Sequence, residues 1–135
     1  MNIVRNIVVV LIAVVAGSLL NIGTLLIGNV VVPLPEGTDP MDPVSLAAAI
    51  PSFTTGHYIF PFLAHALGTF LGAWIAAKFC TSRALLFAMG IGAWFLFGGA
   101  LNAITLPAAL WFEIGDLIFA YLPIAWLAWR LAKRD

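Results

Sequence analysis

The chain has 135 residues, of which 63% are hydrophobic and only 9% are charged, so it is far more apolar than an average soluble domain. Its formal net charge of zero provides no basic surface for nucleic acid, and its single cysteine, Cys80, excludes an internal disulfide and any metal site built from several cysteines. The apolar residues fall in four long runs that one small water-soluble core could not cover, which predicts an integral membrane protein.

The first apolar run covers residues 7–32 and contains no charged side chain. A helix needs about 20 such residues to cross roughly 30 Å of hydrocarbon, so this run is long enough to span a membrane with some tilt. Arg5 before the run and the small residues at 15–18 would also suit a secretory signal. The apolar sequence continues well beyond the core of about 7 to 15 residues that a signal has, and we therefore expect a retained helix.

The next segment, residues 33–56, is rich in proline, which prevents regular helix over most of its length. One short helix is expected at about 43–50, because Asp42 can cap its first amide groups, Pro43 suits the first helical position and Pro51 ends it. The segment is either a passive connector or a cover that lies on the membrane surface or over the mouth of the bundle.

Three further apolar runs complete the predicted fold, at about residues 58–79, 84–106 and 110–129. The connections at 80–83 and 107–109 are so short that consecutive helices must be antiparallel neighbours. Pro123 lies inside the last run, where it removes a backbone hydrogen bond and crowds the carbonyl group of Phe119, so we expect a kink there. Residues 1–135 are therefore predicted to form one domain, an all-α bundle of four transmembrane helices.

The basic residues predict how this bundle is oriented. All six lie beside three of the five segments outside the predicted helices: Arg5, Lys78, Arg83, Arg130, Lys133 and Arg134. Because basic residues resist translocation, both ends of the chain and the connection at 80–83 are expected on the cytoplasmic side. The predicted location is the inner (cytoplasmic) membrane of the cell, with the segment 33–56 facing outward.

Small residues recur at helical spacing on the second and third predicted helices. The second carries the line Ala64, Gly68, Gly72 and Ala76. The third carries Gly90, Gly98 and Asn102 on one line, with Trp94 between, and Ala88 and Gly92 on the next. Helices in lipid associate through close van der Waals packing, which small side chains permit. We expect close packing along these lines, either within the chain or against a second copy.

Polar side chains inside the spans mark the candidate binding site. Counting about 1.5 Å per residue along each helix places them in one layer, in the outward half of the membrane. They are Asn21, His65, Thr69, Asn102, Glu113 and Asp116, and they come from four different helices. No cofactor is expected, because a single well-placed histidine does not make a closed metal site.

His65 and Asp116 are the natural partners in this layer. An ionisable side chain within a span costs on the order of 3 kcal/mol or more unless it faces the bundle interior, water or a partner. The pair therefore serves either a ligand, ion or proton site or only the cohesion of the bundle. Glu113 has a simpler alternative in the first turn of the fourth helix, where the helix dipole favours a carboxylate.

A possible internal repeat relates the first and third helices. Residues 17–25 read GSLLNIGTL and residues 98–106 read GGALNAITL, which align without gaps and match at glycine, leucine, asparagine, threonine and leucine. A true repeat would relate two parallel helical hairpins by an axis along the membrane normal, with their polar residues near that axis.

Residues 60–72, which read FPFLAHALGTFLG, and the four-run pattern give the chain a likeness to a known group. It resembles the small four-helix integral membrane proteins of bacteria whose function is unassigned. This resemblance implies a multi-pass membrane fold and carries no activity. The chain is unlike the small multidrug exporters, whose first helix carries an essential glutamate, because its first helix offers only Asn21.

Two functions of different classes fit these observations. The first is a non-enzymatic accessory or structural subunit that packs against itself, as a homo-oligomer, or within a larger membrane-protein complex in the lipid bilayer. The alternative is a small binding or transport protein that takes a cation, a proton or a small polar solute at the polar layer. An intramembrane enzyme using Glu113, Asp116 and His65 as acid–base groups is a weaker third reading, because it requires all three side chains to converge.

Overall fold

The computed structural model describes residues 2–132. Its helices are α1 (Ile3–Val31), α2 (Pro43–Ala49), the short 3-10 helix η1 (Ile50–Ser52), α3 (Gly56–Phe79), α4 (Ala84–Thr105), α5 (Leu110–Phe119) and α6 (Leu122–Ala132). Four candidate spans are long and apolar enough to cross a membrane, namely α1, α3, α4 and the combined α5 and α6. The predicted all-α architecture, with four segments long and apolar enough to span a membrane, is confirmed.

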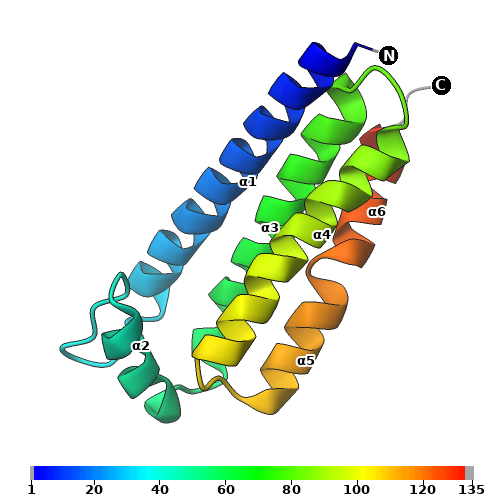
Figure 1. Cartoon of the computed structure of the whole chain (residues 1–135). Helices are drawn as coiled ribbons and strands as arrows, with labels where there is room; N and C mark the ends of the chain where they lie inside the picture. Colours follow the sequence, from blue (N-terminus) through cyan, green and yellow to red (C-terminus); the bar gives the residue numbers. More distant parts are fainter. Residues whose placement is uncertain (1, 133–135) are drawn as a thin grey trace.

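Helix α3 lies at the centre of the bundle (Figure 1). It packs against α1 on one side and against α4 and α6 on the other, whereas α1 and α4 touch only slightly. The start of α1, the turn between α3 and α4 and the end of α6 gather at one end of the molecule, and α2 covers part of the opposite end (Figure 1). The weak contact between α1 and α4 leaves room for a cavity on that side of α3.

Glycine allows α1 and α3 to approach until their backbones touch. A Cβ atom on Gly68 would lie 2.7 Å from the carbonyl oxygen of Gly17, and one on Gly72 would lie 2.9 Å from the carbonyl oxygen of Ala13. No side chain fits at these distances, so the hydrogen atom of glycine is required at both positions. The predicted line on α3 is a packing surface within the chain, because all four of its members are buried: Ala64, Gly68, Gly72 and Ala76.

Helix α4 uses only one of its two predicted lines within the chain. Ala88 and Gly92 are buried, and a Cβ atom on Gly92 would lie 2.6 Å from Cβ of Ala125 on α6. The other line faces outward, since Gly90 and Gly98 have open space beside them and Trp94 is 59% exposed. That line therefore lies on the surface that lipid or another chain would cover.

The fourth span is interrupted, although the sequence predicts one helix at about 110–129 with a kink. Helix α5 ends at Phe119 and α6 begins at Leu122. Pro123 has no N–H group to donate to the carbonyl oxygen of Phe119, and its ring crowds that oxygen, so the helix stops and restarts. The expected kink is a break at Ala120 and Tyr121.

Local capping sets the other helix ends. Helix α1 begins at Ile3, earlier than the predicted start at residue 7, because the side chain of Asn2 accepts a hydrogen bond from the backbone N–H of Arg5. The short helix predicted at about 43–50 is confirmed as α2, and Asp42 caps it by accepting hydrogen bonds from the backbone N–H groups of Val44 and Ser45.

The two segments aligned as a repeat have different surroundings. Gly17 packs against the backbone of Gly68, whereas the aligned Gly98 has no neighbour within 4 Å. The repeat remains a prediction from the sequence, without support from the packing.

Candidate functional site

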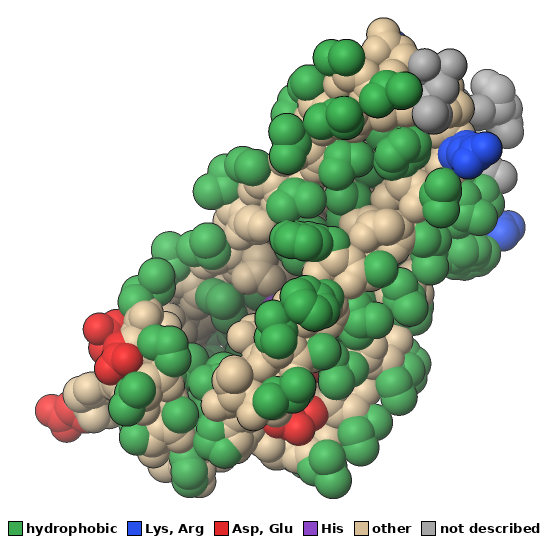
Figure 2. Space-filling view, in the orientation of Figure 1, with side chains coloured by type: hydrophobic (Ala, Val, Ile, Leu, Met, Phe, Trp, Pro, Cys, Tyr) green, Lys and Arg blue, Asp and Glu red, His purple; other side chains and the backbone are tan. Residues whose placement is uncertain are grey.

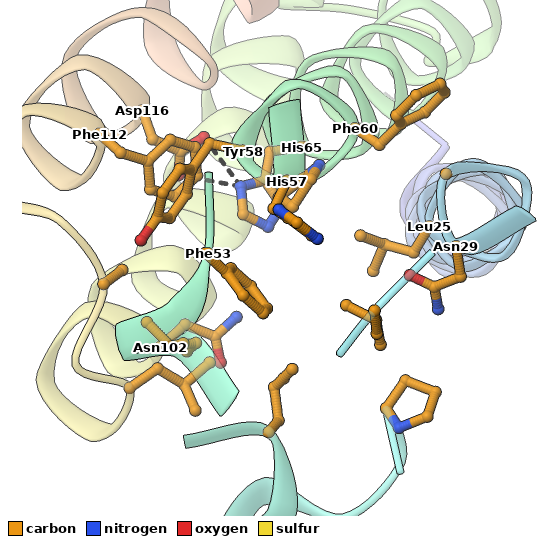
Figure 3. Close-up of a pocket in the computed structure, with 18 of the residues that line it drawn as sticks. Leu25, Asn29, Phe53, His57, Tyr58, Phe60, His65, Asn102, Phe112 and Asp116 are labelled. Atoms are coloured by element: carbon orange, nitrogen blue, oxygen red, sulfur yellow. Dashed lines mark hydrogen bonds and ion pairs between the residues drawn. The ribbon is translucent and has the colours of Figure 1, made fainter. Parts of the chain in front are cut away.

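A cavity of about 250 Å³ lies in the half of the bundle that adjoins α2. Residues of α1, α3, α4 and α5 form its walls, and the segment that carries α2 and η1 contributes to its cover. Figure 2 shows the hollow between α1, α4 and α2, and Figure 3 shows the side chains around it. Most of the lining is apolar, so the few polar side chains that reach the cavity define its chemistry.

His65 and Asp116 meet at the base of this cavity. Nδ1 of His65 lies 2.9 Å from both carboxylate oxygens of Asp116, and Asp116 is only 4% exposed. The predicted pairing of the two residues is confirmed. An ionised carboxylate only accepts hydrogen bonds, so Nδ1 carries the hydrogen and Nε2 is the nitrogen that faces the cavity (Figure 3). Within residues 2–132 no hydrogen bond to Nε2 is formed, which leaves it available to a ligand.

Tyr121 completes the group, and sequence reasoning missed it. Its hydroxyl donates a hydrogen bond of 3.0 Å to Oδ2 of Asp116, and its ring stacks on His65 with centroids 5.6 Å apart. Gly99 on α4 makes room for it, because a Cβ atom there would overlap the Tyr121 hydroxyl. Its sequence position could have identified it, because Tyr121 lies five residues after Asp116 and two residues before the helix-breaking Pro123.

The other predicted site residues divide into two groups. Asn102 and Glu113 line the same cavity as His65 and Asp116. Asn21 and Thr69 are absent from its lining: Asn21 packs its Cβ atom against Gly68, and Thr69 is fully buried. The hydroxyl of Thr69 forms no hydrogen bond within the described residues, so Thr69 contributes to the packing of the bundle and not to its polar contacts.

Aromatic rings surround the cavity (Figure 3). Tyr58 lies against Phe112 with ring centroids 4.7 Å apart, and Phe53 stacks on His57 at the same separation. Phe60 lines the cavity at the contact between α3 and α1, where it packs against Gly28. These rings give the cavity walls that are apolar and whose faces carry partial negative charge.

His57 holds the cover of the cavity in place. Its Nδ1 lies 3.0 Å from the backbone nitrogen of Thr54, whose N–H donates to it, and its Nε2 lies 3.1 Å from the carbonyl oxygen of Pro33. Because Nδ1 accepts and Nε2 donates, this geometry uses the neutral ring. The imidazole thereby ties the chain that follows α1 to the beginning of α3.

The charges around the cavity have one sign. Its lining contains the carboxylates of Glu113 and Asp116 and no lysine or arginine. Figure 2 shows the acidic side chains toward the end of the molecule near α2 and the basic side chains at the opposite end. A positively charged ligand is therefore favoured over an anion. Within the part of the chain that the structure describes, no three side chains among His, Cys, Asp and Glu are grouped to hold a metal ion.

Comparison of the chain with protein families, with curated proteins and with solved structures gives no match.

Proposed function

We propose that this protein is a small membrane binding or transport protein whose cavity takes a cation with an apolar body. The observation that carries the proposal is a buried carboxylate, Asp116, at the base of a largely apolar cavity whose lining includes no lysine or arginine. A charged group within a span costs on the order of 3 kcal/mol or more when it is uncompensated. A cation in the cavity would compensate Asp116 directly.

The size and walls of the cavity support the same ligand class. Its volume of about 250 Å³ lies just below the range of about 300–1,000 Å³ that is typical of sites for drug-sized molecules, so the ligand is smaller than these. The faces of Tyr58, Phe53 and Phe112 suit an organic cation, since each cation–π contact contributes about 0.5 to 2 kcal/mol. Glu113 adds a second carboxylate to the lining.

The test compares benzyltrimethylammonium with its neutral carbon isostere, neopentylbenzene. Binding to the purified protein in mild detergent is measured by isothermal titration calorimetry. We expect the cation to bind at least tenfold more tightly than the isostere, because the attraction between two unit charges about 4 Å apart is about 4 kcal/mol at an effective dielectric constant of about 20, and the neutral isostere has no such attraction to Asp116.

Asp116→Asn removes the negative charge of the site and keeps its shape, so it tests the contribution of the charge alone. We expect this variant to bind the cation at least tenfold more weakly and the isostere unchanged. Glu36→Gln is the matched control, since it removes an exposed carboxylate of the outer segment and should alter neither affinity. Equal binding of both probes by the unmodified protein, or cation binding that survives Asp116→Asn, would contradict the proposal.

We infer that both chain termini and the turn between α3 and α4 lie in the cytoplasm, with the protein in the cell inner membrane. The distribution of basic residues supports this orientation, because Arg5, Lys78, Arg83 and Arg130 adjoin those segments. Lys133 and Arg134, which contribute to the same prediction, lie outside the described residues. In this orientation the cavity belongs to the outward half of the membrane.

The accessory role is the second candidate, and the outward-facing line of α4 favours it. Gly90 and Gly98 have no neighbour within 4 Å, and Trp94 between them is exposed. Such a line allows a second transmembrane helix to approach closely, from another copy or from a larger assembly. If a second helix packs on this line, Gly98→Ile should dissociate the assembly. Light scattering in mild detergent measures the size of the assembly. Gly23→Ile on α1 is the control, because Gly23 also adjoins open space and its replacement should not dissociate the assembly.

A further inference from the structure

We propose that the cavity takes its cation from within the lipid bilayer, through an opening between α1 and α4, and that the ligand is an amphiphile. Its cationic head lies beside Asp116, and its hydrocarbon chain passes out between the two helices into the lipid. This inference rests on the proposed function and names the class of ligand and its route. It derives from the side on which the cavity is open (Figure 2).

Phe95 on α4 limits this opening on the side of the chain termini. A Cβ atom on Gly17 of α1 would lie 2.9 Å from Cζ of the Phe95 ring, and one on Gly72 of α3 would lie 3.3 Å from its Cε2. The ring therefore fills the space between α4 and the other two helices at this level. One turn farther along α4 the cavity is lined by Gly99, which has no side chain to reach across to α1. Because α1 and α4 touch only slightly, the gap between them stays open beyond Phe95.

The lining residues that are also exposed show where the cavity opens. Ile22 and Leu26 on α1 line it although they are 48% and 53% exposed, and Asn102 lines it from α4 and is exposed as well. All three lie within helices that are long and apolar enough to span a membrane. In a membrane, an opening at this level faces hydrocarbon. Lipid chains therefore have access to the edge that Ile22 and Leu26 form.

The route from the aqueous side is covered. Ile50 and Phe53, from the segment that carries α2 and η1, line the cavity toward the end of the bundle, and Ile50 is only 5% exposed. His57 holds this segment through its contacts with Pro33 and Thr54. A ligand that arrives from water must displace this cover, whereas one dissolved in the bilayer meets the opening directly.

The cavity and its opening match the two parts of an amphiphile. Glu113 and Asp116 line the cavity together with no lysine or arginine, which favours a cationic head. A volume of about 250 Å³ accommodates the head and the first part of a chain, so the rest of a long chain extends through the opening. A long chain also concentrates the ligand in the bilayer, because each methylene group increases partition by about fourfold.

A second groove borders Asp116 and is the competing route. It lies between α3 and α5, and its walls include Ile59, Trp111 and Phe119. Glu113 lines the cavity but not this groove. The cavity therefore attracts a cation more strongly than the groove does, and the opening between α1 and α4 is the favoured route.

The first experiment locates the hydrocarbon chain of the bound amphiphile. The protein in lipid nanodiscs is photolabelled with dodecyltrimethylammonium that carries a diazirine in the middle of its chain, and mass spectrometry locates the adducts. We expect labelling of α1 and α4 around Ile22, Leu26 and Asn102, and we expect excess benzyltrimethylammonium to suppress it. Suppressible labelling confined to residues 33–56, or to the groove between α3 and α5, would overturn the route.

Two neighbouring residues of α1 test whether the chain lies in the opening. Leu26→Trp places a larger side chain at its edge and should weaken dodecyltrimethylammonium by about tenfold more than it weakens benzyltrimethylammonium, as steric overpacking does. Ile27→Trp is the matched control, because Ile27 is 61% exposed and does not line the cavity, so neither affinity should change. Both affinities are measured in nanodiscs and corrected for partition into protein-free nanodiscs. Equal weakening of the two ligands by Leu26→Trp would show that the chain lies elsewhere.

The inference and the proposed function fail separately. If benzyltrimethylammonium binds but does not suppress the labelling, the amphiphile does not use the cavity, and the proposed function still stands. If neither benzyltrimethylammonium nor dodecyltrimethylammonium binds above the level of protein-free nanodiscs, both are overturned.

Discussion

Tyr121 donates its hydroxyl hydrogen to Oδ2 of Asp116 across the break between α5 and α6. On an uninterrupted helix, two residues five positions apart would point about 140° away from each other, so their side chains could not meet in this way. The interruption next to Pro123 changes the direction of the chain between them. The helix break is therefore what allows one short segment to supply both the carboxylate and one of its two hydrogen-bond donors.

The first prediction concerns the strength of that hydrogen bond. Tyr121→Phe should lower the free energy of unfolding by about 0.5 to 2 kcal/mol, because Asp116 loses a donor while the membrane limits the gain from any single polar contact. Thermal or detergent-induced unfolding measures the change. Tyr58→Phe, the matched control, removes a hydroxyl that accepts from the backbone N–H of Ala109. In an Asp116→Asn background the effect of Tyr121→Phe should shrink, and an unchanged effect would disprove the coupling.

The second prediction concerns the space that α4 leaves for Tyr121. Gly99→Ala should destabilise the fold by about 1 to 3 kcal/mol and weaken cation binding, since the added methyl group would occupy the position of the Tyr121 hydroxyl. Gly98→Ala differs by one position and adjoins open space, so it should be neutral or slightly stabilising. The two variants are compared by unfolding in the same detergent, and equal stabilities would show that Tyr121 does not need this space.

Sequence patterns predicted the spans, the short helix α2 and the pairing of His65 with Asp116. The spans follow from the length of the apolar runs, and α2 follows from its capping residues. The pairing follows from the cost of an unpaired charge in lipid, which can be recognised from the residue type and its position within a span. The inclusion of Asn102 and Glu113 in one cavity also agrees with their shared depth.

The remaining features depend on how the helices are rotated and spaced, which depth alone does not determine. Asn21 and Thr69 share the predicted depth of the other site residues but contribute to packing between helices, because α1 and α3 approach through Gly17 and Gly68. Tyr121 enters the site only because the helix breaks. The cavity itself results from the slight contact between α1 and α4.

The third prediction tests the backbone contact that fixes α1 on α3. Gly68→Ala should lower the free energy of unfolding by about 1 to 3 kcal/mol, because its Cβ atom would lie 2.7 Å from the carbonyl oxygen of Gly17 and the helices would have to separate. Gly23→Ala on α1 meets nothing within 4 Å and is the matched control. One spin label introduced on α1 and another on α3 should also report a wider separation between the two helices in Gly68→Ala but not in Gly23→Ala. An unchanged distance in Gly68→Ala would contradict the expectation.

The fourth prediction uses Cys80, the single cysteine, to test orientation. Cys80 follows α3 in the turn that we infer to be cytoplasmic. A membrane-impermeant maleimide should therefore label it in inside-out vesicles and not in intact cells. Glu36→Cys in a Cys80→Ser background places the thiol on the exposed outer segment and should give the opposite pattern. Labelling of Cys80 in intact cells would reverse the inferred orientation.

The same thiol gives a pH dependence whose sign follows from its surroundings. Burial raises the pKa of Cys80 above its ordinary value, and the nearby positive charge of Arg5 opposes this increase. The thiolate is the reactive form, so labelling in inside-out vesicles should be slow at neutral pH and should accelerate by about tenfold per pH unit as the pH rises toward the pKa. Arg5→Gln removes the opposing charge and should slow labelling at a given pH by a few fold. Faster labelling in Arg5→Gln would show that Arg5 shields Cys80 from the reagent more than its charge promotes the thiolate.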